Sequence, residues 1–453
     1  MANERISFND IWYVSDGRIR RADIVVEDGI IDSISDKEEI TVTEVSACSL
    51  IGRAGGESAL LLPGVIDEHI HSREPGLTQK GDLTSETHAA AAGGVTTVMD
   101  MPNVVPQTTN LELLEERFAL GAAHSFVNYS FYFGATNSNS SLLPLLDPAH
   151  VPAVKLFMGS STGGMLVDRG ETLHAVFEQS PLPIMTHCED SDVIAKNMRW
   201  AQENYGDDPD VIHHPEIRSR EACIRSSRFA AELARQYGKH LHIAHVTTAE
   251  ELTLAQEATN DSARITLEVC VPHLLFCDED YKRLGTRIKC NPAVKSLADR
   301  EALRAALTDG RITTIATDHA PHLPADKQGG CKRAASGMPM VQFSLVAMMQ
   351  LVEENVLPIE RLVELMCHNP ARLFHIQGRG FIREGMRADL VLLSRTPWTL
   401  TKNEVVSKCG WSPLEGRKFN WKVVSTYCNG QCIYHEGEFA PNNNHAERLI
   451  FNR

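Results

Sequence analysis

The chain has 453 residues, of which 43% are hydrophobic and 23% are charged. These fractions are ordinary for a globular protein, and they exclude disordered, collagen-like and coiled-coil classes. The 44 Lys and Arg residues against 59 Asp and Glu residues give a net charge of −15, which argues against a protein that binds nucleic acid through a basic surface.

The chain opens with strand-like segments that are separated by turns. Ile6–Val14 alternates partly between apolar and polar residues, and Ala22–Val26 is a short apolar run. The dipeptides Asp16-Gly17 and Asp28-Gly29 are typical of turns between paired strands. Residues 1–60 therefore predict part of a small β domain.

Residues 61–370 contain eight short apolar runs, and segments of helical length lie between them. The runs are Val65–His71, Thr96–Met101, Asn128–Gly134, Ala153–Gly159, Leu182–Cys188, Leu241–Val246, Ile265–Val271 and Ile312–His319. The helix-like segments include Thr84–Ala92, Leu111–Ala122, Arg220–Tyr237 and Leu297–Leu307. This alternation, with eight units, predicts a (β/α)8 barrel of the TIM type. A doubly wound α/β sheet is the alternative, but the chain has no GxGxxG or GxxxxGK(S/T) phosphate loop to support it.

Residues 371–453 return to the pattern of the first segment. Strand-like runs occupy Asp389–Ser394, Trp421–Tyr427 and Gln431–Tyr434, and Asn429-Gly430 is a strong hairpin signal. The simplest arrangement is one small β-sandwich domain built from residues 1–60 and 371–453. Its two halves bracket the barrel of residues 61–370.

Residue types that bind metals occur at the ends of several predicted barrel strands, where (β/α)8 enzymes carry their active sites. They are His69, His71, Lys155, His187, His245 and Asp318. His69 and His71 are two residues apart on one strand, so both point the same way and can hold one metal ion. Each residue alone is explained as readily by ordinary structure, but their joint position predicts a metal site. Imidazole and carboxylate ligands without cysteine suit Zn²⁺.

Six candidate ligands exceed the needs of one tetrahedral ion, so the pattern predicts two Zn²⁺ ions. Lys155 lies in the apolar run AVKLFMG, and lysine is rarely buried without a partner or a modification. A neutral lysine that takes up CO₂ becomes a carbamate, whose two oxygens can bridge both metals. Hydroxide is the expected second bridge, because two metals stabilise it at neutral pH and polarise the carbonyl that it attacks.

Several segments together resemble the cyclic amidohydrolases, which include dihydroorotases, allantoinases and dihydropyrimidinases (hydantoinases). The segments are LLPGVIDEHIH, AVKLFMG, MTHC, IAHV and ATDHAPH, and SKCGWSPLEG adds to them near the C-terminus. The resemblance implies that the more buried metal is held by the HxH pair, the bridging lysine and Asp318. It implies that the second metal is held by the same lysine and the histidines of MTHC and IAHV.

The residues beside the metal ligands resemble dihydroorotases most closely. Arg73 in HSREPG matches an arginine that grips the ring carboxylate of the substrate, and Asn103 in the MPN motif accompanies it. Allantoinases usually have asparagine at the position of Arg73, and hydantoinases also lack the arginine. A planar guanidinium suits a carboxylate, and Asn103 adds neutral donors. A loop salt bridge to Glu74 or Asp82 is the purely structural alternative for Arg73.

The same resemblance implies further substrate contacts. It places His322 on the ring carboxylate, Asn291 on the ring amide, and the loop backbone at Ser336 and Gly337 against the ring. Each position also has an ordinary explanation as part of a loop or, for Asn291, an Asn-Pro turn. His273 follows the seventh predicted strand and stays unassigned, because dihydroorotases often show two histidines there.

The implied activity is the reversible hydrolysis of (S)-dihydroorotate to N-carbamoyl-L-aspartate in de novo pyrimidine biosynthesis. The bridging hydroxide attacks the ring amide carbonyl, and Asp318 passes its proton to the departing ring nitrogen. Some bacterial dihydroorotases of this length have aspartate at position 155, whereas allantoinases and hydantoinases share the lysine. An allantoinase or hydantoinase-type hydrolase is therefore the alternative. A metal-free scaffold is a remote one, because all the ligand positions are intact.

The expected partners are the small-molecule substrate and, by family resemblance, further copies of the chain in a homodimer or homotetramer. No run of 18 apolar residues and no apolar core of a signal peptide occur, so we expect a cytoplasmic protein without a membrane partner. Eleven cysteines without a CxxC pair favour free thiols over a disulfide scaffold.

Overall fold

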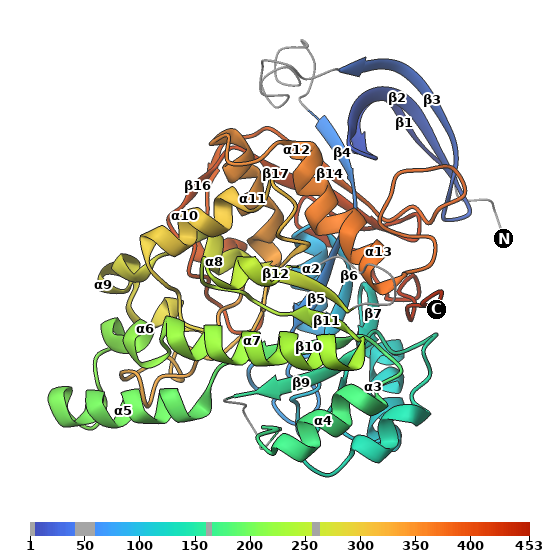
Figure 1. Ribbon diagram of the computed structural model, residues 1–453. Coiled ribbons are helices and arrows are strands. Elements are labelled where there is room, and N and C mark those ends of the chain that lie inside the picture. Colours follow the sequence, from blue (N-terminus) through green and yellow to red (C-terminus); the bar gives the residue numbers. More distant parts are fainter. Residues whose placement is uncertain (1–4, 41–58, 160–164, 256–262) are drawn as a thin grey trace.

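The centre of the molecule is a barrel of parallel strands, seen in the computed structural model, which describes residues 5–40, 59–159, 165–255 and 263–453 (Figure 1). The strands are β5 (Val65–Ile70), β6 (Val95–Asp100), β7 (Asn128–Phe131), β8 (Phe133–Gly134), β9 (Val154–Met158), β10 (Ile184–Cys188), β11 (His240–Ile243), β12 (Arg264–Cys270) and β13 (Thr314–Ala316). They pair in chain order, with β7 and β8 together in the third position, and a bridge between Ile70 and His319 closes the ring. The predicted (β/α)8 barrel is confirmed, and each predicted run overlaps its strand.

Helices cover the outside of the barrel (Figure 1). They are α2 (Leu83–Ala92), α3 (Leu111–His124), α4 (Gly170–Gln179), α5 (Ser191–Tyr205), α6 (His214–Ile217), α7 (Arg220–Tyr237), α8 (Val271–Leu275), α9 (Tyr281–Leu284), α10 (Leu297–Ala305), α11 (Ser344–Glu353), α12 (Ile359–Val363) and α13 (Asn369–Phe374). The local sequence explains where these helices begin and end, as α7 illustrates. Before α7 the Ser219 side chain accepts a hydrogen bond from the Ala222 amide, and Gly238 follows the last turn.

A second sheet combines strands from both ends of the chain. Its strands, in spatial order, are β19 (Glu438–Phe439), β18 (Gln431–His435), β17 (Lys422–Cys428), β14 (Leu390–Ser394), β4 (Ala59–Pro63), β1 (Arg5–Ser15), β2 (Arg18–Glu27) and β3 (Ile30–Ile40). Strands β15 (Trp398–Thr399) and β16 (Lys418–Phe419) form a separate pair. The antiparallel pairing of β14 with β4, with Val391 opposite Leu62, joins the two halves. The sequence pattern did not predict β3, because this edge strand is largely polar and exposed.

The β sheet positions the first barrel strand. Only Gly64 separates β4 from β5, so a central strand of the sheet leads directly into the strand that ends beside His69 and His71. Near the start of β5, Ile66 packs in one buried cluster with Leu449 and Phe451 from the C-terminal segment. The division of the chain at residues 60 and 370 stays a prediction, and part of its first segment, residues 41–58, lies outside the described residues.

The described residues bear on two expectations from the sequence, one about membrane-spanning helices and one about cysteines. No helix among them is long and apolar enough to cross a bilayer. Their cysteines are all free thiols, and all of these except Cys432 are buried. Cys48 lies outside the described residues.

Candidate metal centre and substrate cavity

Every site residue predicted from the sequence lines one cavity at the C-terminal ends of the barrel strands. The lining residues are His69, His71, Arg73, Asn103, Lys155, Phe157, His187, His245, Asn291, Asp318, Ala320, His322, Ser336 and Gly337. They come from strand ends and loops that are far apart in the sequence, and the closure of the barrel brings them together. Their individual roles stay predictions.

The HxH pair and Asp318 form one half of the candidate metal centre. The Nε2 atoms of His69 and His71 lie 3.3 Å and 3.0 Å from Asp318 Oδ1. Burial alone would raise the pKa of Asp318, but the adjacent His69 and His71 outweigh this effect and hold the pKa well below its usual value. The carboxylate is therefore ionised, as a metal ligand must be.

His187, His245 and Lys155 form the other half. His187 Nδ1 and His245 Nε2 lie 2.9 Å apart, so these two nitrogens converge on one point. Lys155 Nζ is fully buried and has no hydrogen-bond partner among the described residues. Burial lowers the pKa of Lys155, and this favours the neutral amine that can react with CO₂.

The backbone is strained where the chain leaves three of the barrel strands. The φ angles are +74° at Arg73, +38° at His245 and +47° at Asp318. Residues other than glycine rarely adopt this left-handed region, and each instance costs about 1–3 kcal/mol. Such strain collects at functional sites because the surrounding structure holds a side chain in a required position.

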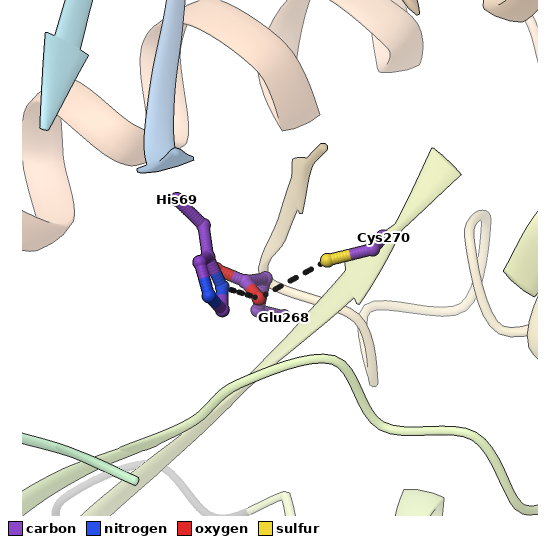
Figure 2. Close-up of side chains that lie close together, drawn as sticks. All are labelled: His69, Glu268 and Cys270. Atoms are coloured by element: carbon purple, nitrogen blue, oxygen red, sulfur yellow. Dashed lines mark hydrogen bonds and ion pairs between the residues drawn. The ribbon is translucent and has the colours of Figure 1, made fainter. Parts of the chain in front are cut away.

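Two buried carboxylates that the sequence pattern did not predict bind two of the candidate metal ligands, His69 and His187. Glu268 Oε1 accepts a hydrogen bond from His69 Nδ1 at 2.8 Å, and Figure 2 shows this carboxylate between His69 and Cys270. Glu189 Oε2 accepts from His187 Nε2 at 3.0 Å and also pairs with Arg218. Carboxylates in this position fix the tautomer and the orientation of an imidazole ligand. The available signal for Glu268 was a charge within the apolar run ITLEVCV, since a buried charge needs a partner.

Arg73 and His322 occupy another side of the cavity. Arg73 Nε donates to the Pro321 carbonyl at 3.1 Å, and its Nη2 lies 3.1 Å from His322 Nε2. The alternative salt bridges to Glu74 and Asp82 are not formed, because these carboxylates bind groups around the start of α2 and at the protein surface. Burial lowers the pKa of Arg73 to about 10, so the guanidinium keeps its charge at neutral pH.

Asn103 contacts a metal-facing histidine as well as lining the cavity. Its Oδ1 accepts a hydrogen bond from His71 Nδ1 at 2.8 Å, so it can orient His71 in addition to the predicted substrate contact. His273, which the sequence left unassigned, donates from Nε2 to the Pro292 carbonyl at 3.1 Å. It is not among the described residues that line the cavity.

The loop after β13 supplies backbone groups to the cavity. The Ser336 carbonyl lies 3.1 Å from His322 Nε2. Gly337 has a φ of +143°, and a Cβ atom there would lie 2.6 Å from the Ala320 carbonyl oxygen. Only glycine therefore allows the loop to approach so closely. Asn291 Oδ1 is buried nearby without a hydrogen-bond partner in the described parts of the chain.

The segment Ser407–Gly416 supports this loop from outside the cavity. Ser407 Oγ donates to Glu86 Oε2 at 2.6 Å, and Glu86 Oε2 also lies 2.8 Å from His319 Nε2. Trp411 Nε1 donates to the carbonyl of His322 at 2.8 Å. The motif SKCGWSPLEG thus binds the chain at His322, the predicted substrate contact, and is linked through Glu86 to His319.

The donor set fits divalent metal ions. The ligand atoms of His69, His71 and Asp318 lie within 4.8 Å of one another. Two further such groups occur among the described residues: His69, Glu268 and Cys270, which Figure 2 shows, and Glu68, His242 and Glu268. Imidazoles that converge with a carboxylate and a buried, unpartnered lysine have the chemistry that a pair of bridged ions needs.

Comparisons with known proteins agree with this geometry. Residues 60–433 match the sequence profile of the amidohydrolase family. A dihydroorotase from Lactiplantibacillus plantarum is 32% identical over 431 residues, which cover 94% of this chain and 96% of that protein. An allantoinase from Bacillus velezensis is 28% identical over 430 residues, with coverages of 94% and 92%.

A solved structure extends the comparison to the fold. The L-hydantoinase (dihydropyrimidinase) from Arthrobacter aurescens superposes with a TM-score of 0.87 at 26% sequence identity, and the match covers 98% of each chain. The similarity therefore extends over nearly the whole chain, but the similar proteins carry more than one substrate name.

Proposed function

This chain belongs to the amidohydrolase family as a cyclic amidohydrolase, and we propose that it is a dihydroorotase. The proposed reaction is the reversible hydrolysis of (S)-dihydroorotate to N-carbamoyl-L-aspartate, a step of pyrimidine biosynthesis. The observation that carries the proposal is the pair of Arg73 and His322 beside the candidate metal centre. A buried guanidinium there suits a substrate whose ring bears a carboxylate.

The proposal includes two Zn²⁺ ions. His69, His71, Lys155 and Asp318 would hold one ion, and Lys155, His187 and His245 would hold the other, with N6-carboxylated Lys155 and hydroxide between them. When bound, the two ions supply hydroxide at neutral pH and polarise the amide carbonyl. Support comes from the buried, unpartnered Nζ of Lys155 and from the convergent imidazole nitrogens.

The side chains have distinct roles in the proposed reaction. Arg73 and His322 bind the ring carboxylate and set the ring against the metal centre. Asp318 is the proposed proton carrier: its ionised carboxylate accepts the proton of the attacking water and donates it to the ring nitrogen as the C–N bond breaks. Asn291 contacts the ring amide in the proposed complex, and the backbone at Ser336 and Gly337 lies against the ring. The cyclisation reverses these steps.

The test is a substrate panel of dihydroorotate, allantoin, hydantoin and dihydrouracil, assayed with zinc and bicarbonate. We expect turnover to be highest with dihydroorotate. Arg73→Met should raise KM for dihydroorotate about tenfold or more, since a charge-assisted hydrogen bond is lost. It should leave KM for uncharged dihydrouracil nearly unchanged. Equal effects on both substrates would argue against recognition of a carboxylate.

Allantoin hydrolysis is the second candidate, favoured by the similarity to the Bacillus velezensis allantoinase. A panel in which allantoin is turned over faster than dihydroorotate would replace the first proposal with this one.

A further inference from the structure

Lys80 contacts His322 on the far side of its ring from Arg73. Lys80 Nζ lies 3.1 Å from His322 Nδ1 and 3.4 Å from Asp326 Oδ2. Lys80 itself is not among the described residues that line the cavity. Its contact with the site runs through the imidazole, whose Nε2 faces Arg73.

The contact with Lys80 fixes the tautomer of His322. Lys80 and Arg73 only donate hydrogen bonds, and each lies 3.1 Å from one ring nitrogen of His322, so a neutral ring can accept from only one of them. The Ser336 carbonyl only accepts and lies 3.1 Å from Nε2, which favours Nδ1 as the nitrogen that accepts from Lys80. A neutral imidazole with an accepting Nδ1 carries its proton on Nε2. Burial, and then the positive charges of Arg73 and Lys80, lower the pKa of His322 and keep its ring neutral. The Nε2–H group donates toward the Ser336 carbonyl at 3.1 Å.

This tautomer sets two donors side by side. Arg73 Nη2 lies 3.1 Å from His322 Nε2, and a guanidinium also only donates. In this tautomer neither group accepts from the other, so a ligand that only accepts can take a hydrogen bond from Arg73 and share the Nε2–H group of His322 with the Ser336 carbonyl. An ionised carboxylate is such a group, and its hydrogen bonds are about twice as strong as those between neutral groups.

We propose that Lys80 is a positioning residue that determines the preference for an anionic ring, because it fixes the Nε2–H tautomer and makes His322 a second donor beside Arg73. This inference rests on the proposed function, in which the substrate bears a carboxylate. Without Lys80, the His322 proton moves to Nδ1 and Nε2 accepts from Arg73. The two side chains then satisfy each other instead of the substrate.

Two substitutions distinguish the hydrogen-bond donor of the Lys80 side chain from its positive charge. Lys80→Met removes both, whereas Lys80→Gln keeps a neutral donor. In the zinc-loaded enzyme, Lys80→Met should raise KM for dihydroorotate about ten- to hundredfold with little change in kcat. Lys80→Gln should stay within about threefold of the wild type. Equal increases in KM for both variants, or an unchanged KM for Lys80→Met, would overturn the proposal.

Lys408→Met is the matched control. Lys408 Nζ lies 2.7 Å from Asp82 Oδ2, two residues after Lys80, and no contact joins it to His322 within the described residues. This variant should leave KM and kcat for dihydroorotate unchanged. If it raised KM as much as Lys80→Met, any loss of nearby positive charge would explain the effect, and the specific role of Lys80 would be rejected.

The tautomer can be measured without a substrate. Nitrogen-15 NMR of the histidine-labelled, zinc-loaded enzyme distinguishes protonated from unprotonated ring nitrogens, and the spectrum of His322→Asn identifies the signals of His322. We expect the proton on Nε2 in the wild type and in Lys80→Gln, and on Nδ1 in Lys80→Met. An Nε2 proton retained in Lys80→Met refutes the inference. A wild type that does not hydrolyse dihydroorotate refutes the proposed function instead.

Discussion

Lys155 is the residue whose surroundings most directly suggest a modification. Its Nζ lies at zero exposure without a hydrogen-bond partner in the described structure. An unmodified lysine there gives up its hydration without gaining a hydrogen bond, and the ring of Phe157 at 5.3 Å from Nζ replaces only part of what is lost. A carbamate on Nζ, bound to metal, would remove that penalty.

Lys155→Met therefore tests the bridge. We expect bound zinc, measured by elemental analysis, to fall by at least about half, and activity to fall about a hundredfold or more. Methionine fills a similar volume and carries no charge, so stability against urea in the presence of a chelator should not fall. Zinc content equal to that of the wild type would contradict the carbamate.

Glu268 contacts His69, a candidate metal ligand, but is not itself one of the predicted ligands. Glu268→Gln keeps the shape of the side chain and removes the charge that the His69 ring faces at 2.8 Å. Metal affinity, measured by competition with a chelator, should fall about 10- to 100-fold. Glu250→Gln is the control, because Glu250 pairs with Arg220 at the surface, and it should leave the affinity unchanged. Equal affinities for Glu268→Gln and the wild type would refute the positioning role.

At this scale the sequence predicted the residues whose type alone suggests chemistry. Two histidines spaced by one residue, and a lysine in an apolar run, are visible without a structure. Glu268 and Lys80 were not predicted, because their importance depends on contacts with His69 and His322, more than 190 residues away in each case. No local pattern encodes such a contact.

At the scale of elements, the backbones of adjacent barrel strands approach each other closely at the ends that carry the site residues. Strand β9 ends beside Gly159, whose φ is +128°. A Cβ atom there would lie 2.0 Å from the Glu189 carbonyl oxygen, just after β10. The residue that orients His187 is therefore packed directly against the end of the strand that carries Lys155.

Gly159→Ala should disturb both strand ends. The methyl group forces apart two backbone segments and strains φ, so we expect a loss of about 2 kcal/mol or more in urea unfolding, together with weaker metal binding. Gly170→Ala is the matched control, because nothing lies within 4 Å of its Cβ position. It should be neutral or slightly stabilising at the start of α4. Unchanged stability in Gly159→Ala would mean that the strand ends separate freely.

The barrel strands were predictable because apolar runs of strand length recur between helical segments. Strand β3 was not, because an exposed edge strand has no apolar face to reveal it. The bend that brings Asp318 to His69 was also not predictable. It depends on a left-handed φ at a residue that usually avoids it.

At the scale of the whole molecule, contacts between distant segments join the β sheet to the barrel. The β1–β2 turn is held by His368, whose Nε2 accepts a hydrogen bond from the Asp16 amide at 3.0 Å. His368 Nδ1 donates to the Gly380 carbonyl at 2.6 Å. Both ring nitrogens are thus used by a neutral imidazole, and burial lowers the pKa of His368.

This buried histidine makes the stability depend on pH. In the unfolded chain a histidine binds its proton near pH 6.5, whereas folded His368 resists protonation to a lower pH. The unfolded state therefore gains protons first, so the contribution is complete above about pH 6.5 and is lost progressively below it. The largest slope is about 1.4 kcal/mol per pH unit. Asp67, whose pKa burial raises to about 7, also titrates in this range, but it is unchanged in the variants compared below, so its contribution cancels in the difference between slopes.

Urea unfolding between about pH 7.5 and 5.5 measures this slope. The free energy of unfolding of the wild type should fall on acidification, and His368→Gln should show a smaller slope, since its side chain binds no proton in either state. The candidate metal ligands titrate equally in both proteins, so their contribution cancels in the comparison. Identical slopes in His368→Gln and the wild type would mean that His368 is protonated equally in the folded and unfolded chains, contrary to its two hydrogen bonds.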